Sequence, residues 1–356
     1  MRGVRGLILL LGSALALSPA AASPADAPFP PGTSVQTLEG LRCSVVMPAE
    51  FDPAKERSLL VVLHGNGGTE TGMAGSLGFL AEKEFVVVAP KSTGLGWDKK
   101  DVDAVRRFTA DLKKRLHVGE GRLHVVGFSN GGFNLSPLAF DEELKCASAT
   151  WVASGCTGGQ VPKWAKKGMG VLAMAGERDP NLEVARKTVD LLGDKVRTAM
   201  WRSQPGKAHE WPDGLMPFFG WWVTVQEGRF VPGECLPFDW IEDPKGAAAL
   251  MVSKKTGGLA YIWSKDQAAD PAAKAFQNEL LLDPLVQRFG RQLVAWQAER
   301  ADAPGPVGGE KAPPEPPCVL VYDAQGVRVK ALQGKVTAAA LAAALRSVAP
   351  DKSMPK

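Results

Sequence analysis

Residues 123–132 have the sequence LHVVGFSNGG, in which an apolar run leads directly into a serine flanked by glycines. Ser129 has Gly127 two positions before it and Gly131 two positions after it. This spacing is typical of a nucleophile elbow, a sharp turn between a strand and a helix that exposes the serine hydroxyl. Glycines are expected there because strand and helix pass so closely that a Cβ atom would clash. The motif is short, so its meaning depends on the sequence around it.

The overall composition is that of an ordinary globular protein. The chain has 356 residues, long enough for two domains, with 45% hydrophobic and 22% charged residues. A net charge of +4 without a Lys/Arg cluster gives no basis for nucleic-acid binding. We therefore expect no nucleic-acid partner.

The first 22 residues have the layout of a secretory signal peptide. A basic start at residues 1–5 precedes an apolar run at 7–17 and the small residues at 20–22. The run is too short to span a membrane. We predict a secreted or periplasmic protein with no stable membrane span after cleavage, followed by a flexible leader at 23–32; an uncleaved anchor is the alternative.

Export would make disulfide bonds possible. The chain has five cysteines, so at least one stays unpaired, and the sequence does not establish the pairing. The pair that we expect first is Cys146 with Cys156.

Buried strands and amphipathic helices alternate over the first two thirds of the chain. The helix predicted at 101–116 places Val102, Val105 and Phe108 on one face. Strands are predicted at 41–47, 58–63, 85–88, 123–126, 148–153, 170–175 and 196–201, and further helices from 131 and at 181–192. This order predicts a doubly wound, mostly parallel α/β sheet covered on both faces, in a domain at residues 33–230.

The pattern changes after a linker predicted at 231–245. A second, smaller α/β domain at 246–350 is expected to contain a helix at 246–255, a strand at 259–263, a helix at 271–289, a strand at 291–296, an irregular Pro-rich loop at 301–317, a hairpin at 318–332 and a helix at 337–348.

A serine nucleophile needs a base, and the base needs an acid that holds its tautomer. On an elbow fold the acid and then the histidine follow the serine in the chain. His209 is the only histidine after Ser129, and it lies in a loop after a predicted strand. Asp179 lies just beyond the preceding strand, while Glu177 is the reserve acid. The alternatives are a solvated loop histidine and an Asp179 that only caps a helix.

The oxyanion of the tetrahedral intermediate needs two hydrogen-bond donors. One is the backbone amide of the residue after the nucleophile, here Asn130, and the other comes from a loop after an early strand. Residues 64–68, HGNGG, form such a loop, and we assign the second donor to the amide of Asn66. The alternative, a phosphate cradle, lacks the Lys-Ser/Thr that follows in a P-loop.

These motifs together resemble the α/β-hydrolases. The chain has a strand followed by HGNGG, then GFSNGG, GERDP at 176–180 and a late histidine, a set most similar to phospholipase/carboxylesterases, polyhydroxybutyrate depolymerases and feruloyl esterases. The resemblance covers the first predicted domain and implies hydrolysis of a small or polymeric carboxylic ester through Ser129, His209 and Asp179, without metal or cofactor. Two alternatives are a serine peptidase of the same fold, although the large accompanying domain of such peptidases is missing, and a binding protein that has kept the hydrolase shell.

Tryptophans are candidates for the substrate pocket. The chain has ten, and Trp97, Trp211, Trp221 and Trp222 lie near predicted strand ends or the histidine loop. We expect most of them to be core residues and Trp97 to line the pocket.

The C-terminal part resembles the thioredoxin fold. Residues 260–266, AYIWSKD, are similar to the strand that leads to that family's active site, and 317–322, PCVLVY, are similar to its cis-proline strand. Residues 267–270, QAAD, stand where the redox pair would be, so dithiol chemistry is excluded. Cys318 is interpreted as a small buried strand residue. The resemblance implies a redox-inactive module that binds a protein or ligand or only packs.

Overall fold

The structure is a computed structural model of the chain. It describes residues 28–52, 54–229, 240–241, 244–264, 271, 273, 276, 280–290, 292–299, 315–334, 336–350 and 352. The predicted signal peptide, residues 23–27 of the leader, most of the linker, and residues 267–270 lie outside the described residues. Within the described ranges, no helix combines the length and the apolar character that crossing a membrane requires.

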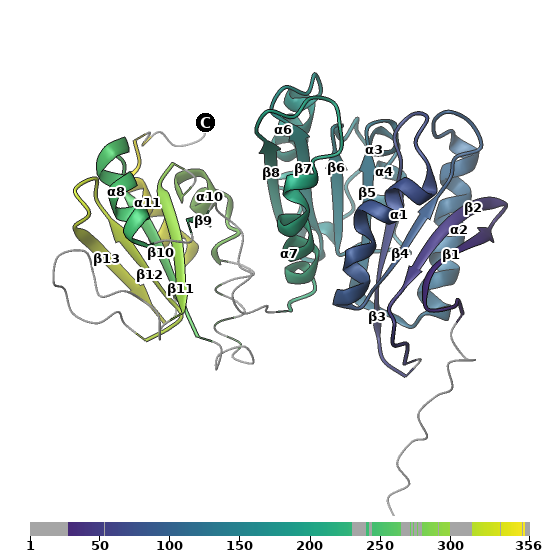
Figure 1. The fold of residues 1–356 in the computed structure, drawn as a ribbon, viewed down its shortest axis with the longest axis horizontal. Coiled ribbons are helices and arrows are strands. Elements are labelled where there is room, and N and C mark those ends of the chain that lie inside the picture. The colour runs from purple at the N-terminus through teal and green to yellow at the C-terminus, as the bar shows by residue number, and fades with distance from the viewer. Residues whose placement is uncertain are drawn as a thin grey trace, which may run out of the picture.

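The first sheet has eight strands in the order β1-β2-β4-β3-β5-β6-β7-β8 (Figure 1). Its strands are β1 (Gly32–Leu38), β2 (Leu41–Met47), β3 (Arg57–Leu63), β4 (Phe85–Pro90), β5 (Val118–Phe128), β6 (Ser148–Val152), β7 (Gly170–Gly176) and β8 (Thr198–Gln204). β2 is antiparallel to β1 and to β4, and all other neighbours are parallel. The sheet is therefore mostly parallel, as predicted.

Helices cover both faces of this sheet. They are α1 (Glu70–Leu77), η2 (Gly78–Lys83), α2 (Lys99–Arg115), α3 (Asn130–Phe133), α4 (Ser136–Ala139), α5 (Ala165–Gly168), α6 (Leu182–Leu192), η3 (Asp213–Leu215) and α7 (Met216–Gln226). Leu60 and Val62 of β3 pack in the core formed with α1 and α7, whereas Val61 packs in the core formed with α2. Since consecutive strand residues point to opposite faces, an unbroken apolar strand serves both cores.

Three local features differ from the sequence-based expectation. β1 was not predicted; it pairs with β2 as an antiparallel hairpin. The helix after the elbow is short, because Pro137 in the first turn of α4 has no amide hydrogen to bond the Phe133 carbonyl. Phe29, in the segment predicted as a flexible leader, is buried, and the Arg115 guanidinium lies 5.4 Å from the centroid of its ring.

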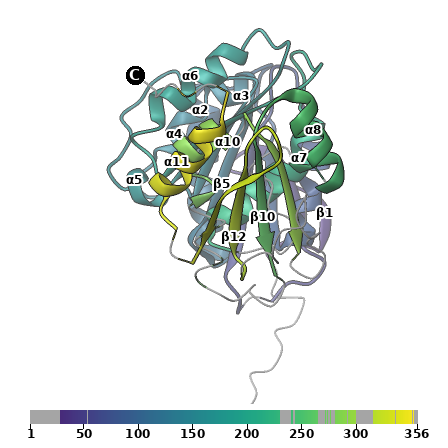
Figure 2. The same ribbon diagram turned by 90° about the vertical axis from the view of Figure 1, so that its left-hand side faces the viewer.

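The second sheet has the order β13-β12-β10-β11-β9 among the described residues. Its strands are β9 (Trp240–Ile241), β10 (Gly258–Trp263), β11 (Val294–Glu299), β12 (Cys318–Tyr322) and β13 (Arg328–Gln333), and its helices are α8 (Pro244–Lys254), α10 (Pro284–Gly290) and α11 (Ala338–Val348). α8 packs on one face, while α10 and α11 pack on the other (Figure 2). The predicted hairpin and closing helix are confirmed.

The helix predicted at 271–289 is interrupted. A turn follows Leu280, and Asp283 begins the next helix by accepting a hydrogen bond from the Val286 amide at 3.2 Å. β11 begins at Val294, three residues later than predicted. The peptide bond between Pro316 and Pro317, directly before β12, is cis.

The two sheets meet beside β8, the edge strand of the first sheet (Figure 1). The Thr198 hydroxyl donates a hydrogen bond of 3.2 Å to the Leu282 carbonyl. Apolar side chains of α7 and of the segment before α10 belong to one continuous core. The second sheet therefore packs on the side of the first that carries β8.

Candidate active site

Ser129 occupies a strained turn between β5 and α3. Its φ of 49° lies in the left-handed region, which is unfavourable for a residue with a Cβ atom. A Cβ atom on Gly127 would lie 2.5 Å from the Gly131 carbonyl oxygen, and one on Gly131 would lie 2.5 Å from the His64 carbonyl oxygen. The glycines are thus required for space, as the motif predicted.

Ser129, His209 and Asp179 lie together at the carboxyl ends of parallel strands. The Ser129 hydroxyl oxygen is 2.8 Å from Nε2 of His209. Nδ1 of His209 is 3.1 Å from each carboxylate oxygen of Asp179. The structure therefore brings together the three residues that the sequence indicated, from the ends of β5, β7 and β8.

The Asp179 side chain is fully buried, while 38% of the His209 side chain is exposed. Asp179 also accepts a hydrogen bond of 2.7 Å from the Asn181 amide, so the buried carboxylate has two partners. Because an ionised carboxylate only accepts, Nδ1 of His209 is the donor, and Nε2 is left to accept the Ser129 hydroxyl proton. This is the tautomer that a base for Ser129 requires.

Glu177, the reserve acid, has a different partner. Its carboxylate accepts a hydrogen bond of 3.1 Å from the Gly206 amide. The Arg178 amide donates to the Lys207 carbonyl at 2.8 Å. The residues between β7 and α6 thus hold the histidine loop, and Asp179 is the acid that contacts His209.

Aromatic packing also orients His209. The Phe128 ring, at the end of β5, stacks on the His209 ring with a centroid distance of 5.5 Å. Trp211 meets the same Phe128 ring edge-on at 5.8 Å. Phe128, the residue before the nucleophile, therefore supports the His209 imidazole through ring stacking.

The side chains of Asn66 and Asn130 both lie close to Gly96. A Cβ atom on Gly96 would lie 2.4 Å from Oδ1 of Asn66 and 2.7 Å from Oδ1 of Asn130. The Gly67 amide donates to Leu95 and the Gly68 amide to Gly65, at 2.7 and 2.9 Å. Across the described part of the chain, the amides of Asn66 and Asn130 have no hydrogen-bond partner.

Trp97, which was predicted to line the substrate pocket, is buried in the structure. Only 6% of the residue is exposed, and its indole N–H donates to the His64 carbonyl at 2.7 Å. Its ring also packs against the His64 ring at 4.9 Å. A buried tryptophan is stable when its indole N–H has a hydrogen-bond acceptor. Trp97 therefore supports the glycine-rich loop at residues 64–68 through its contacts with His64. Trp221 and Trp222 are buried too, as expected for core residues.

His64 is a buried residue whose contacts the sequence analysis did not identify. Nε2 of His64 accepts a hydrogen bond of 3.0 Å from the Ser92 amide, so Nδ1 is the donor to the Gly65 carbonyl at 2.6 Å. Burial lowers the pKa of His64, and the Lys91 charge acts in the same direction. A neutral imidazole thus ties the glycine-rich loop to the loop after β4. The sequence signal for this role was the position of His64 directly before the glycine-rich loop.

The two remaining histidines make their contacts away from Ser129. His124, inside β5, is buried between Ser148 and Glu227 at 2.8 and 3.0 Å. Burial alone would raise the pKa of Glu227, but the hydrogen bond and charge of His124 hold that pKa below its ordinary value. His117 ends the segment after α2 with a φ of 50°. His209 is the histidine that contacts the nucleophile.

The expected disulfide between Cys146 and Cys156 is not formed. The Cys146 thiol is buried and lies 3.5 Å from the Leu138 carbonyl, whereas the Cys156 sulfur lies 3.6 Å from the Ser136 hydroxyl. Burial raises the pKa of Cys146 to about 12. The expectation was wrong because the intervening β6 carries the two residues to different surroundings.

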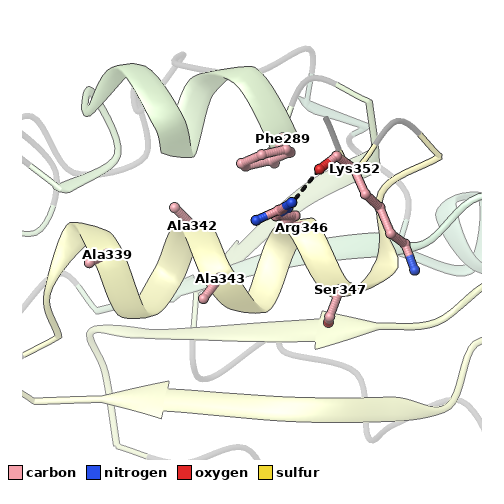
Figure 3. Close-up of a pocket in the computed structure, with 7 residues that line it drawn as sticks. All are labelled: Phe289, Ala339, Ala342, Ala343, Arg346, Ser347 and Lys352. Atoms are coloured by element: carbon pink, nitrogen blue, oxygen red, sulfur yellow. Dashed lines mark hydrogen bonds between the residues drawn. The ribbon is translucent and has the colours of Figure 1, made fainter. Parts of the chain in front are cut away.

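A surface hollow of about 510 Å³ lies between α10 and α11 (Figure 3). Its wall contains Phe289, Ala342 and Arg346, and the Arg346 guanidinium donates to the Lys352 carbonyl at 2.6 Å. A second hollow of about 530 Å³ lies beside Phe140. The walls of both contain none of Ser129, Asp179 and His209.

No protein-family profile matches the chain, and no curated protein matches it. Among solved structures, a carboxylesterase from Bacillus cereus is 18% identical over 52% of this chain and 94% of that chain, with a TM-score of 0.43. A carboxylesterase from Mesorhizobium loti is 20% identical over 54% of this chain and 99% of that chain, with a TM-score of 0.43. A feruloyl esterase module from Clostridium thermocellum is 15% identical over 56% and 90%, with a TM-score of 0.42.

Proposed function

We propose that the protein is a serine hydrolase that cleaves carboxylic esters through an acyl-enzyme intermediate. The observation that carries this proposal is the chain of contacts from the Ser129 hydroxyl to Nε2 of His209 at 2.8 Å and from Nδ1 of His209 to Asp179 at 3.1 Å. The nucleophile is within hydrogen-bond reach of the base, and the base is within reach of the acid that orients it.

In the first half of the reaction, the Ser129 oxygen attacks the ester carbonyl carbon while Nε2 of His209 takes the hydroxyl proton. The carbonyl oxygen becomes an oxyanion, which accepts hydrogen bonds from the amides of Asn66 and Asn130. The bond to the alcohol oxygen then breaks, and His209 returns the proton to the departing alcohol. Ser129 is left as an acyl ester.

Water completes the second half. His209 takes a proton from the water as the water oxygen attacks the acyl carbon, and a second oxyanion forms in the same place. When the bond to Ser129 breaks, His209 returns the proton to the serine oxygen and the carboxylic acid leaves. Asp179 stabilises the imidazolium that forms in both halves. Each oxyanion donor contributes roughly 3 kcal/mol of transition-state stabilisation in comparable sites.

Two further proposals concern the rest of the chain. We propose that residues 1–22 direct export and are removed, and that residues 33–230 and 246–350 form two domains. We also propose that the second has a thioredoxin-like arrangement without redox activity. The burial of Cys318 in β12 supports the absence of redox activity. A module of this kind would contact a protein or ligand, while the first domain acts on a small or polymeric ester.

The test is activity together with active-site labelling. Protein lacking residues 1–22 should hydrolyse a short-chain chromogenic ester and be labelled by a fluorophosphonate at Ser129. Ser129→Ala should lower kcat by a factor of roughly 10⁴ or more. Ser136→Ala is the matched control, because Ser136 is the next serine in the chain and its hydroxyl lies near Cys156.

The alternatives give different results in the same assays. Faster turnover of an aminoacyl amide than of the corresponding ester would indicate a peptidase. No labelling of the native wild-type protein, or full activity in Ser129→Ala, would refute the serine hydrolase proposal. Appreciable insulin reduction would refute the redox-inactive assignment of the second domain.

A further inference from the structure

The loop between β4 and α2, residues 91–98, is tied to the glycine-rich loop along its whole length; we refer to it as the bracing loop. The Leu95 carbonyl accepts from the Gly67 amide at 2.7 Å. The other ties run from the Lys91 ammonium to the Gly68 carbonyl at 2.8 Å, from the Ser92 amide to Nε2 of His64 at 3.0 Å, and from the Trp97 indole N–H to the His64 carbonyl at 2.7 Å. The bracing loop therefore fixes the backbone that contains Asn66.

The same loop also holds the residue after the nucleophile. The Trp97 amide donates a hydrogen bond of 2.8 Å to Oδ1 of Asn130. Trp97 thus uses its backbone for Asn130 and its side chain for His64. The two loops that carry the proposed oxyanion donors are fixed to one common element.

Gly96 lies at the closest point of this arrangement. A side-chain carbon there would lie 2.4 Å from Asn66 Oδ1 and 2.7 Å from Asn130 Oδ1, so one of the two side chains would have to move. Gly94, two residues earlier in the same loop, differs. The nearest atom to a Cβ there, the Gly96 carbonyl oxygen, would be 3.8 Å away. The space is restricted at one glycine and open at the other.

The bracing loop is itself fixed to α2. Asp101 accepts hydrogen bonds from the Thr93 amide at 3.0 Å and from the Thr93 hydroxyl at 2.9 Å. Asp98 caps the helix by accepting from the Asp101 amide at 2.8 Å. Since α2 packs into the core through residues such as Val105 and Phe108, the loop has a rigid base.

We propose that the bracing loop positions the oxyanion hole, with Gly96 and the Asn130 side chain as positioning residues. This inference rests on the proposed esterase function. Oxyanion donors act only when they stand roughly 2.7–3.1 Å from the developing charge, so a small displacement of either amide removes stabilisation of the transition state without removing substrate binding. A displaced donor should therefore lower kcat and leave KM nearly unchanged.

The first test compares two alanine substitutions in the bracing loop. Gly96→Ala should lower kcat by about 10- to 100-fold, with KM changed by less than about threefold. The inhibition constant of a trifluoromethyl ketone, whose adduct with Ser129 carries an oxyanion, should rise in parallel. Gly94→Ala should keep both values within about twofold of wild type.

The second test removes the side-chain carboxamide of Asn130 and keeps its backbone amide. It does not depend on the folding of Gly96→Ala. Asn130→Ala should show the same loss of kcat and of trifluoromethyl ketone affinity. Its pH–rate profile should keep the wild-type midpoint, because the His209–Asp179 pair is unchanged. Asn134→Ala is the control: it removes a hydrogen bond of 2.9 Å to the Asn130 carbonyl from the same turn but leaves the bond to Trp97.

The possible results separate this inference from the function on which it rests. An active wild type, together with wild-type kcat and inhibition constants in Gly96→Ala or Asn130→Ala, would overturn the positioning role alone. An equal loss in Gly94→Ala or Asn134→Ala would overturn it as well, because the effect would then be general. A wild type that neither hydrolyses esters nor reacts with the fluorophosphonate would refute the proposed function and this inference with it.

Discussion

Both carboxylate oxygens of Asp179 lie 3.1 Å from Nδ1 of His209, although 30 residues separate the two in the chain. The carboxylate is buried, and Glu177, two residues earlier, bonds the Gly206 amide instead. The same short segment after β7 therefore supplies one acid that orients the imidazole and another that holds its loop.

Exchanging each acid for its amide should separate the two roles. In Asp179→Asn, the new amide can donate to Nδ1, which favours the wrong imidazole tautomer, so kcat should fall by roughly 10⁴. Glu177→Gln keeps an oxygen acceptor for the Gly206 amide and should stay within about fivefold of wild type. Steady-state ester hydrolysis measures both. A larger loss in Glu177→Gln than in Asp179→Asn would show that the roles are reversed.

Space at the elbow should limit stability as well as activity. In Gly131→Ala, the new Cβ would meet the His64 and Leu63 carbonyl oxygens at 2.5 and 2.6 Å, and backbone atoms cannot move aside cheaply. We expect a loss of unfolding free energy of about 2 kcal/mol or more. Gly75→Ala, exposed in α1 with nothing within 4 Å of the new carbon, should instead gain up to about 1 kcal/mol. Urea unfolding compares them, and equal stability of the two variants would contradict the crowding at Gly131.

His64 should make stability depend on pH on the acidic side of neutrality. Burial lowers its pKa from the ordinary 6.5, so the unfolded chain takes up a proton that the folded chain resists. Above that value both states hold a neutral imidazole and this contribution is constant. The unfolding free energy should therefore decrease as the pH falls below 6.5.

His64→Gln should lose this part of the slope, because glutamine does not titrate. The comparison is urea unfolding of the two proteins between pH 7.5 and about 5.5, above the range where carboxylates titrate. The other three histidines are present in both proteins, so their contributions cancel in the difference. Parallel curves for the two proteins would show that the pKa of His64 is the same in the folded and unfolded chains.

The thiols should react in an order set by burial. Cys156 is partly exposed, whereas burial raises the pKa of both Cys43 and Cys146 to about 12 and leaves almost no thiolate at pH 8. Iodoacetamide should therefore modify Cys156 in the native protein, and Cys43 and Cys146 only after denaturation. Mass spectrometry of the peptides reports each site, with Cys156→Ser as the control. Recovery of a Cys146–Cys156 cross-linked peptide would contradict the structure.

Most strands of the first sheet were predictable because local apolar runs mark where each strand lies along the chain. An apolar run such as residues 58–63 can be satisfied only between two covered faces, and β3 is buried throughout. β1 was missed because its side chains are mostly exposed or half-buried, so no apolar run marks it. The break before α10 was missed although Pro284 signals it, because a proline inside a helix has no amide hydrogen to bond the Leu280 carbonyl.

The sequence by itself determined the elbow, since steric exclusion around Gly127 and Gly131 depends on residue type, and it determined the order of Ser129, Asp179 and His209. Tertiary structure decided which acid contacts His209, because Glu177 and Asp179 differ only in the direction that the chain takes after β7. It also decided that Trp97 is buried, with its indole N–H bonded to the His64 carbonyl. Whether a side chain faces a cavity or the core depends on packing from distant segments, here residues 64–68 and α3, and no local pattern contains that information.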